Sequence, residues 1–473
     1  MRRTKIIATL GPAADSEEVI RALLLAGVSA VRLNFSHGTH EEHRRTLETF
    51  KKVRAELGLF TASILDTKGP EIRIRTFEGG RAELVCGQTF TITTENIVGT
   101  SERVSTTYPD LHRELKPGDR VLIDDGLIEL VVKEIAGRDV CCEVINGGEL
   151  RDNKGVNIPG VPIRISALSE RDISDLRFAV ENDMDFIAAS FIRSRADVEQ
   201  VRRVLKELGG EKIRIIAKIE NRQGVDNIAE IIEAADAVMV ARGDLGVEMP
   251  SYEVPIIQKR IVSDCVAAGK PVIVATQMLD SMMRNPRPTR AEVSDVANAV
   301  YDGAGCVMLS GETASGKYPV ESVKTMAETL LAAERSIDYW ERFRARGLSR
   351  RCNSIDDAIT SACCTTAMEL CAAAIVTVTN SGHTARMIAR FRPACPIIAL
   401  SEHEIVCRQL SLSWGVEPRA CARLDSTDAL FDAGVRAALE SGIVKKGDTV
   451  VLTAGVPIGL SGSTNLIKAQ VVS

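Results

Sequence analysis

The sequence is poor in features that mark several large classes of protein. Only 4% of its 473 residues are aromatic, no long basic run occurs, and the formal net charge is −5. These numbers disfavour a nucleic-acid platform or an anionic membrane surface as partner. The first apolar run, KIIATL, is ended by Gly11–Pro12 and is too short for a signal peptide or a membrane span. We therefore expect a cytoplasmic protein with neither nucleic acid nor membrane as partner.

The cysteine pattern lacks the spacing of a metal site. Twelve cysteines are present, but none forms a CxxC pair. Cys141–Cys142 and Cys363–Cys364 are adjacent pairs inside apolar segments. Reduced, buried thiols in a cytoplasmic protein explain this pattern better than zinc or disulfides.

What the sequence has in abundance is an alternation of apolar strands and amphipathic helices. The composition, 45% hydrophobic and 26% charged with 35 glycines, is typical of α/β proteins, and the length predicts several domains. The predicted strands lie in TKIIATLGP, SAVRLNFSHG, ASILDTKGP, MDFIAASF, IRIIAKIE, ADAVMVARGD, KPVIVAT and GCVMLSGE. Eight strand–helix units over about 250 residues predict a (β/α)8 TIM barrel.

Two further domains are expected besides the barrel. From Pro70 to about Ser166, short β-type runs separated by Gly, Asp and Asn turns show no helical period, which predicts a small β domain inserted into the barrel. Near the end, a helix over Ser354–Ala373 and further strands predict another α/β unit. We propose a barrel of residues 1–69 and 167–345, an inserted domain of residues 70–166, and a C-terminal domain of residues 346–473.

Two segments predict where helices begin. Asp15 with Glu18, and Thr39 with Glu42, match the capping-box pattern. His37, His40 and His43 follow at three-residue steps around the second of these starts. They straddle the helix start rather than share one face, so we reject a metal site there and expect His40 and His43 to be solvated helix residues.

The stretch IRIIAKIEN, residues 213–221, carries the strongest chemical signal. Its alternation puts Ile213, Ile215, Ala217 and Ile219 on one face and Arg214, Ile216, Lys218 and Glu220 on the other. A lysine and a carboxylate on one face of a buried strand need a partner, a metal or a substrate, because burying either charge alone is costly. A structural ion pair without a catalytic role is the alternative.

Polar residues at the ends of other strands favour the catalytic interpretation, because the C-terminal ends of barrel strands form the active site. They are Arg32, Asn34, Asp66, Ser190, Lys218, Glu220, Asp244 and Thr276. Glu220 and Asp244 suit a hard ion such as Mg²⁺ or Mn²⁺. With Lys218 and Arg32 they could neutralise phosphate oxygens during phosphoryl transfer. The oxygens of Asn34, Ser36, Asp66 and Thr67 could hold a monovalent cation or serve as hydrogen-bond scaffolding.

A glycine- and hydroxyl-rich turn occurs in the C-terminal unit. In TNSGHTAR, residues 379–386, Ser381, Gly382 and Thr384 precede a predicted helix. Such a turn can bind an anion through backbone N–H groups. On local chemistry alone, an ordinary N-cap is the favoured interpretation.

Eight motifs in this order resemble pyruvate kinase, and the resemblance runs from Thr4 to Val472. The motifs are RLNFSHG, DTKGPEIR, KGVNIPG, SFIR, IAKIEN, ARGDLGVE, ATQML and LSGETA. The resemblance implies transfer of the phosphoryl group of phosphoenolpyruvate to ADP, giving pyruvate and ATP. It also implies that the insertion is a small β-barrel lid.

The resemblance also implies residue roles. The implied catalytic residues are Lys218, Arg32 and Thr276. The implied substrate contacts are Arg32, Lys218, Gly243, Asp244 and Thr276, to which we add Ser190. The implied nucleotide contacts are Asn34, Phe35, Ser36, His37, Arg73 and Lys154. The implied ligands are Glu220 and Asp244 for Mg²⁺ (or Mn²⁺), and Asn34, Ser36, Asp66 and Thr67 for K⁺.

Regulation and assembly follow from the same resemblance. Glu71 is the residue type of K⁺-dependent members, which implies K⁺ dependence. The 379–384 turn resembles the effector-phosphate loop, so Thr379, Asn380, Ser381, Gly382 and Thr384 are expected to bind a sugar phosphate or AMP. The short ends imply a compact bacterial form without an extra C-terminal domain, and the family is usually a homotetramer.

Two other functions fit part of this pattern. A divalent-metal barrel aldolase or lyase acting through an enolate would use a similar metal site. A phosphate-binding regulatory protein with an inactive barrel would be expected to lack at least one of Lys218, Glu220 and Asp244, and all three are present.

Overall fold

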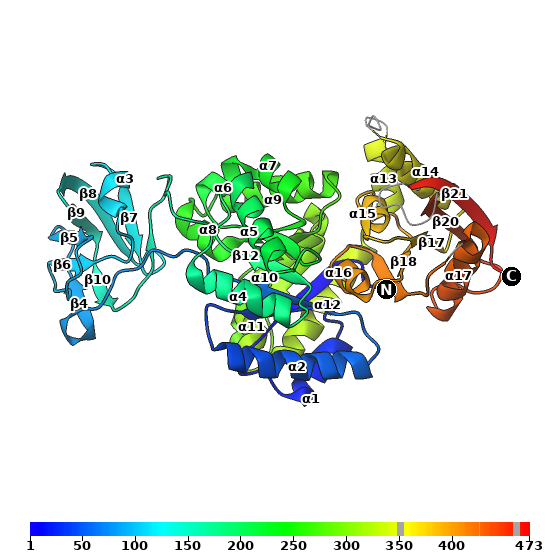
Figure 1. The fold of residues 1–473 in the computed structure, drawn as a ribbon, viewed down its shortest axis with the longest axis horizontal. Helices are drawn as coiled ribbons and strands as arrows, with labels where there is room; N and C mark the ends of the chain where they lie inside the picture. The colour runs from blue at the N-terminus through cyan, green and yellow to red at the C-terminus, as the bar shows by residue number, and fades with distance from the viewer. Residues whose placement is uncertain (348–353, 425, 457–463) are drawn as a thin grey trace.

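The computed structural model describes residues 1–347, 354–424, 426–456 and 464–473. Figure 1 shows three bodies in a row, with the inserted β domain at one end, the barrel in the middle and the C-terminal α/β domain at the other end. This arrangement confirms the predicted fold class. The proposed boundaries 69/70 and 166/167 fall in the two connections between barrel and insertion, and the boundary 345/346 falls inside the helix α13 (Tyr339–Gly347).

Eight parallel strands close the barrel, and all eight were predicted. They are β1 (Lys5–Leu10), β2 (Ala30–Asn34), β3 (Ala62–Asp66), β12 (Phe186–Ala189), β13 (Arg214–Ile219), β14 (Ala237–Ala241), β15 (Val272–Ala275) and β16 (Cys306–Leu309). Each strand pairs with its sequence neighbour in the barrel, and β16 pairs with β1 to close it. The insertion lies between β3 and the helix that follows it, so β3 and β12 still pair.

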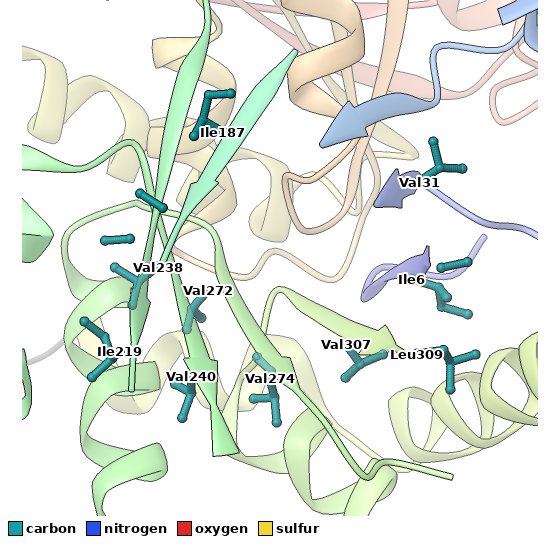
Figure 2. Packing of buried hydrophobic residues seen from close by; sticks show 14 of the residues in the cluster. Ile6, Val31, Ile187, Ile219, Val238, Val240, Val272, Val274, Val307 and Leu309 are labelled. Atoms are coloured by element: carbon teal, nitrogen blue, oxygen red, sulfur yellow. The ribbon is translucent and has the colours of Figure 1, made fainter. Parts of the chain in front are cut away.

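The two faces of each strand serve two cores. Ile215, Ala217 and Ile219 of β13 point outward into the layer between barrel and helices, and Figure 2 shows other members of that layer, such as Val238 and Val272. Ile216 belongs to a separate cluster inside the barrel, made largely of strand side chains. Lys218 shares that inward face, as the alternation predicted.

Helices surround the barrel and cover the outer layer. They are α1 (Glu17–Leu25), α2 (His40–Glu56), α4 (Glu170–Glu181), α5 (Arg195–Glu207), α6 (Arg222–Asp226), α7 (Ile228–Ala234), α8 (Arg242–Glu248), α9 (Val254–Ala267), α10 (Arg290–Asp302), α11 (Gly311–Ala314) and α12 (Pro319–Arg335), with the 3-10 turn η2 (Asp280–Met283). None of the helices in the described ranges has both the length and the apolar character that a membrane crossing requires.

One of the two predicted helix starts was wrong by a residue. The Thr39–Glu42 capping box of α2 is present, with both reciprocal hydrogen bonds. At α1 the N-cap is Ser16, whose hydroxyl accepts from the N–H of Val19, rather than Asp15. Serine and aspartate are equally good N-caps, so the adjacent pair left the exact start undecided.

The insertion forms the expected small β domain around its own core. A six-stranded sheet contains β5 (Thr89–Thr93), β6 (Arg103–Ser105), β7 (Arg120–Ile123), β8 (Ile128–Ala136), β9 (Asp139–Asn146) and β11 (Val156–Asn157), and a separate pair contains β4 (Arg81–Leu84) and β10 (Gly148–Arg151). The hydrogen-bonded strands therefore form two sheets and do not close into one barrel. Two short helical turns that were not predicted are present, η1 (Glu78–Gly80) and α3 (Leu111–Glu114).

The C-terminal domain is a five-stranded sheet flanked by helices. Its elements are α14 (Ile355–Glu369), β17 (Ala374–Val378), α15 (His383–Ala389), β18 (Ile397–Ser401), α16 (Glu404–Leu410), β19 (Val416–Ala420), α17 (Thr427–Glu440), β20 (Thr449–Gly455) and β21 (Thr464–Val471). The predicted helix over Ser354–Ala373 is present but shorter. Ser354 is its N-cap, and the backbone turns left-handed at Cys371, with φ 48°.

The segment after α16 closes the N-terminal end of the barrel. Leu412 is fully buried and belongs to the cluster inside the barrel, although it comes from the C-terminal domain. The thiol of Cys306 donates to the carbonyl of Leu412, and the ammonium group of Lys5 donates to the carbonyl of Val416 at 2.7 Å. Arg408 pairs with the buried Asp185 at 2.6 Å. The C-terminal domain thus supplies the floor of the barrel.

Leu412→Ala should destabilise the protein, because it leaves a cavity beneath the barrel core. Buried leucine-to-alanine changes cost about 2–5 kcal/mol. Thermal unfolding should therefore occur at a lower temperature than in the natural chain, while Leu25→Ala, at a residue 69% exposed, serves as the matched control. Equal melting temperatures for the two variants would contradict the role of Leu412 as a floor.

Candidate active site

Four charged side chains from three strands meet inside the C-terminal mouth of the barrel. Arg32 lies on β2, Asp66 is the last residue of β3, Lys218 lies on β13, and Glu220 follows β13 directly. All four are buried. The inward face of each strand places them there, as the sequence predicted for Lys218 and Glu220.

Asp66 contacts both cations. One of its carboxylate oxygens lies 2.5 Å from Nε of Arg32, and the other lies 3.0 Å from Nζ of Lys218. Lys218 also lies 2.9 Å from a carboxylate oxygen of Glu220. The alternating chain Arg32–Asp66–Lys218–Glu220 compensates charges that would be costly to bury alone.

The loop after β12 adds hydrogen bonds to Lys218 and Glu220. The hydroxyl of Ser190 accepts from Nζ of Lys218 at 2.7 Å and donates to the carbonyl of Thr67. The N–H of Phe191 donates to Glu220 at 2.6 Å. Phe191 holds a left-handed backbone with φ 54°. This turn aims its N–H into the mouth.

Burial and neighbouring charges act in opposite directions on Lys218 and Asp66. Burial disfavours the ammonium form of Lys218, but the carboxylates of Asp66 and Glu220 outweigh burial and raise the pKa of Lys218. Burial likewise opposes ionisation of Asp66, but Arg32 and Lys218 hold the pKa of its carboxyl below the usual range. Both groups are therefore charged at neutral pH.

For Glu220 and Asp244, burial outweighs the neighbouring positive charge. Asp244 lies in the first turn of α8, which directly follows β14, the neighbour of β13 in the barrel. Burial raises the pKa of both carboxyl groups, and the positive charge of Lys218 offsets this only in part. One buried and one partly buried carboxylate with too little positive charge nearby are a donor set that suits a hard divalent cation.

Thr276 sits at the end of β15 in an unusual conformation. Its φ of 70° is left-handed, and its hydroxyl accepts from the N–H of Gly243 at 2.8 Å and donates to the carbonyl of Ala275 at 2.6 Å. A β-branched residue rarely adopts this conformation. The hydrogen bond to Gly243 ties Thr276 to the first turn of α8, which carries Asp244.

A cleft of about 520 Å³ opens between the mouth and the inserted domain. Its walls include Asp244 on the barrel side and Arg73 and Lys154 on the inserted domain. Arg73 pairs with Glu71 at 2.5 Å, and Lys154 pairs with Asp124 at 2.8 Å. Both predicted nucleotide contacts of the insertion thus face the cleft, each held by an acidic neighbour.

The other predicted nucleotide contacts lie beside β2 and are not part of the lining of this cleft. Asn34 accepts from the N–H of Ser36 at 3.2 Å, and His37 is exposed. Phe35 is 1% exposed, and its ring packs on Phe178. Its N–H donates to the carbonyl of Asp66 and its carbonyl accepts from Arg171.

The predicted cation ligands Asn34, Ser36, Asp66 and Thr67 come from neighbouring strand ends. Asn34 and Asp66 are partners in the β2–β3 register. The hydroxyl of Thr67 accepts from the N–H of Ser190 at 3.2 Å. Both Asp66 oxygens already contact cationic side chains, a role as shared counter-ion that sequence analysis did not assign.

The expectation that His40 and His43 are solvated is correct only in part, since the side chain of His40 is 42% exposed. Both are partly buried because they pack on Phe35. The ring of His43 stacks on that of Phe35, with centroids 4.1 Å apart. His40 lies 2.6 Å from the carboxylate of Asp175. These histidines join α2 to the barrel core.

The predicted effector residues lie in the C-terminal domain, on the β17–α15 connection. Gly382 has φ 76° and precedes the helix, and its N–H donates to the hydroxyl of Thr379 at 3.0 Å. Thr384 lies inside the first turn of α15 rather than before it, and its hydroxyl hydrogen-bonds that of Thr464 at 2.7 Å. Asn380 and Ser381 complete the turn.

Sequence reasoning missed two groups near the site. Arg242 precedes the Gly243–Asp244 pair and binds backbone near Thr276. Asp125 of the inserted domain lines the cleft, and its negative charge contributes to raising the pKa of Asp244. The signal for Arg242 was its place in ARGD directly after a buried strand, whereas nothing local distinguished Asp125 from a turn residue.

Fold and site together define a barrel enzyme built to handle a phosphoryl group. Two family profiles match the chain, "Pyruvate kinase, barrel domain" over residues 1–323 and "Pyruvate kinase, alpha/beta domain" over residues 357–470. The chain belongs to the pyruvate kinase family.

Individual relatives agree over the full length. The chain is 51% identical to a pyruvate kinase of Clostridium acetobutylicum, with 100% of both chains covered. It is 49% identical to one of Geobacillus stearothermophilus, covering 100% of this chain and 81% of the relative. The crystal structure of a pyruvate kinase from Cryptosporidium parvum superposes with a TM-score of 0.95 at 38% identity, covering 100% of this chain and 96% of that one.

Asp66→Asn should destabilise the protein strongly, because it leaves two buried cations without their shared counter-ion. Breaking a buried ion pair by removing one partner costs about 3–5 kcal/mol. Asp226→Asn is the matched control, since Asp226 pairs with Arg222 on the surface, where ion pairs contribute about 0–1 kcal/mol. Chemical denaturation of the two variants should differ clearly, and equal losses would contradict the role of Asp66.

Proposed function

We propose that the protein transfers the phosphoryl group of phosphoenolpyruvate to ADP, producing pyruvate and ATP. The observation that carries the proposal is the buried Arg32–Asp66–Lys218–Glu220 chain at the mouth of the barrel. It places two cations beside Glu220 and Asp244, the two carboxylates that lack sufficient positive charge. Family membership supports the same reaction.

Arg32 and Lys218 would bind the phosphoryl oxygens. The transferring group carries charge on its equatorial oxygens, so catalysis depends mainly on positioning and electrostatic stabilisation. Asp66 fixes both cationic groups by contacts of 2.5 and 3.0 Å. Because they are preorganised, little reorganisation accompanies the reaction. Ser190, which already accepts from Lys218, would contact the substrate beside it.

Glu220 and Asp244 would hold Mg²⁺ or Mn²⁺. The raised pKa of each carboxyl group fits this assignment, because a bound dication would supply the missing positive charge. When bound, the ion would add charge stabilisation at the phosphate oxygens. The remaining coordination positions are left for substrate oxygens and water.

Thr276 and the Gly243–Asp244 backbone would bind the substrate carboxylate. Loss of the phosphoryl group leaves the enolate of pyruvate, whose methylene carbon must then gain a proton. The hydroxyl of Thr276, held 2.8 Å from the N–H of Gly243, belongs to the relay that we propose for this proton. The amide groups fix the carboxylate so that the methylene carbon keeps one orientation.

Asn34, Ser36, Asp66 and Thr67 would hold K⁺, in keeping with the family. Arg73 and Lys154 would bind the phosphates of ADP, together with residues 34–37. The acidic partners Glu71 and Asp124 hold them at the cleft wall. The inserted domain would act as a lid that closes over bound nucleotide and excludes water.

The C-terminal domain would supply regulation. The 379–384 turn would bind the phosphate of a sugar phosphate or of AMP through the backbone N–H groups before α15. We further propose a cytoplasmic homotetramer, as the family suggests.

A pyruvate assay separates this function from that of a metal-dependent aldolase or lyase acting through an enolate. Phosphoenolpyruvate should give pyruvate only when ADP is present, and Lys218→Met should lose about 10²–10³-fold in kcat because a preorganised charge is removed. Lys270→Met is the matched control, since Lys270 is a partly buried lysine that donates to backbone carbonyls at the barrel floor. Pyruvate release without ADP, or normal turnover of Lys218→Met, would refute the proposal.

Replacing KCl with NaCl should lower kcat steeply. The smaller Na⁺ would leave the oxygens of the proposed K⁺ site too far apart for coordination. Initial rates at matched ionic strength measure the effect, and titration with tetramethylammonium chloride controls for salt alone. Equal rates in KCl and NaCl would remove the K⁺ site from the proposal.

A further inference from the structure

Two consecutive residues beside the proposed substrate site have left-handed backbones. Thr276 has φ 70° and Gln277 has φ 53°. Thr276 is β-branched, so its side chain crowds the backbone in this region, and such conformations persist only where surrounding structure holds them. The contacts that hold this turn are therefore part of the site.

Arg242 makes most of these contacts from the neighbouring strand end. Its Nη2 donates to the carbonyl of Thr276 at 2.7 Å, and its Nε donates to the carbonyl of Ala275 at 3.2 Å. Nη2 also lies 2.9 Å from the sulfur of Met278. One guanidinium group thus spans the turn on both sides of Thr276.

Asp295 on α10 fixes the guanidinium group itself. Its two carboxylate oxygens each lie 2.8 Å from Arg242, one from Nη1 and one from Nη2. The side chain of Arg242 is only 15% exposed. A planar guanidinium held by two parallel contacts keeps a fixed direction, which an ammonium group cannot reproduce.

A second buried carboxylate braces the far end of the same turn. Glu312, 2% exposed, accepts from the N–H of Leu279 at 3.0 Å and from the N–H of Ser310 at 2.8 Å. Both ends of the Thr276–Leu279 segment are therefore anchored by side chains from other loops of the barrel mouth.

We propose that Arg242 and Asp295 are positioning residues that hold Thr276 in its left-handed conformation and so aim its hydroxyl at the substrate. The inference rests on the proposed function, in which Thr276 serves the carboxylate and the enolate. Neither Arg242 nor Asp295 has to touch the substrate. Without the guanidinium, Thr276 relaxes toward negative φ, and its hydroxyl leaves the N–H of Gly243.

The effect should appear in kcat rather than in nucleotide affinity. Arg242→Met should lower kcat about 10–100-fold, since small displacements of a reacting group are costly, while KM for ADP stays within about twofold. Arg242→Lys should recover only a minor part, because one ammonium group cannot reach both carbonyls and Asp295. Asp295→Asn keeps the contacts to the carbonyls and should show a smaller loss.

A double-mutant cycle with Thr276→Val tests whether Arg242 acts through Thr276. Two rates are measured for each variant. One is the formation of pyruvate, and the other is the exchange of the methyl protons of pyruvate in D2O, followed by NMR with Mg²⁺, K⁺ and ATP present. If the proposal is right, Arg242→Met costs nothing further once the hydroxyl is gone, so the two losses are strongly non-additive.

Arg202→Met is the matched control for losing an arginine. Arg202 donates to the carbonyl of Ala234 at 2.9 Å and pairs with Asp236 at 3.1 Å, the same kind of contacts at the other end of the barrel. It should leave kcat unchanged. Circular dichroism checks that each variant folds. If Arg242→Met does not fold, Asp295→Asn provides the test.

Each remaining outcome overturns one specific claim. Multiplicative losses in the cycle, a full rate in Thr276→Val alone, or equal losses in Arg202→Met and Arg242→Met would overturn the positioning role. Failure of the natural chain to form pyruvate would instead overturn the proposed function. The two failures are therefore distinguishable in one set of assays.

Discussion

The carboxylate of Asp66 keeps two cations side by side inside the barrel that would otherwise repel each other. Arg32 and Lys218 come from strands on either side of β3 in the closed order, and Asp66 contacts one with each oxygen. Buried charges persist only when they are paired in this way. Every role that we assign to the mouth depends on these two cations being fixed before a substrate arrives.

The same region also contains two carboxyl groups that have too little positive charge nearby. Glu220 shares Lys218 with Asp66, and the charge of Lys218 offsets the burial of Asp244 only in part, so burial dominates and raises the pKa of both carboxyl groups. Ionising both carboxyl groups is therefore costly in the protein without a ligand, and the proposed dication would remove this cost. In the mouth, the charges of Arg32, Asp66 and Lys218 are therefore compensated by one another, whereas those of Glu220 and Asp244 are compensated only in part.

Regular patterns carried the sequence prediction, and irregular backbone limited it. The period-2 alternation of residues 213–221 placed Lys218 inside the barrel and Ile215 outside, and the structure confirms both. Alternation says nothing about a left-handed residue, so the conformation of Thr276 and its dependence on Arg242 were not predictable. Side-chain contacts were also not predictable: His40 and His43 pack on Phe35, and His40 pairs with Asp175 of α4. In the insertion, runs of short strands did not determine how they divide into two sheets.

The floor of the barrel has a consequence for how the chain folds during synthesis. Leu412 fills the N-terminal end of the barrel interior, although it is translated after all eight strands and after α13 and α14. The emerging barrel therefore has an open base until the ribosome has released much of the C-terminal domain. Until then Leu412 is missing from the lower interior, and Asp185 lacks its contact with Arg408. Completion of the catalytic body is in this way coupled to the synthesis of the C-terminal domain.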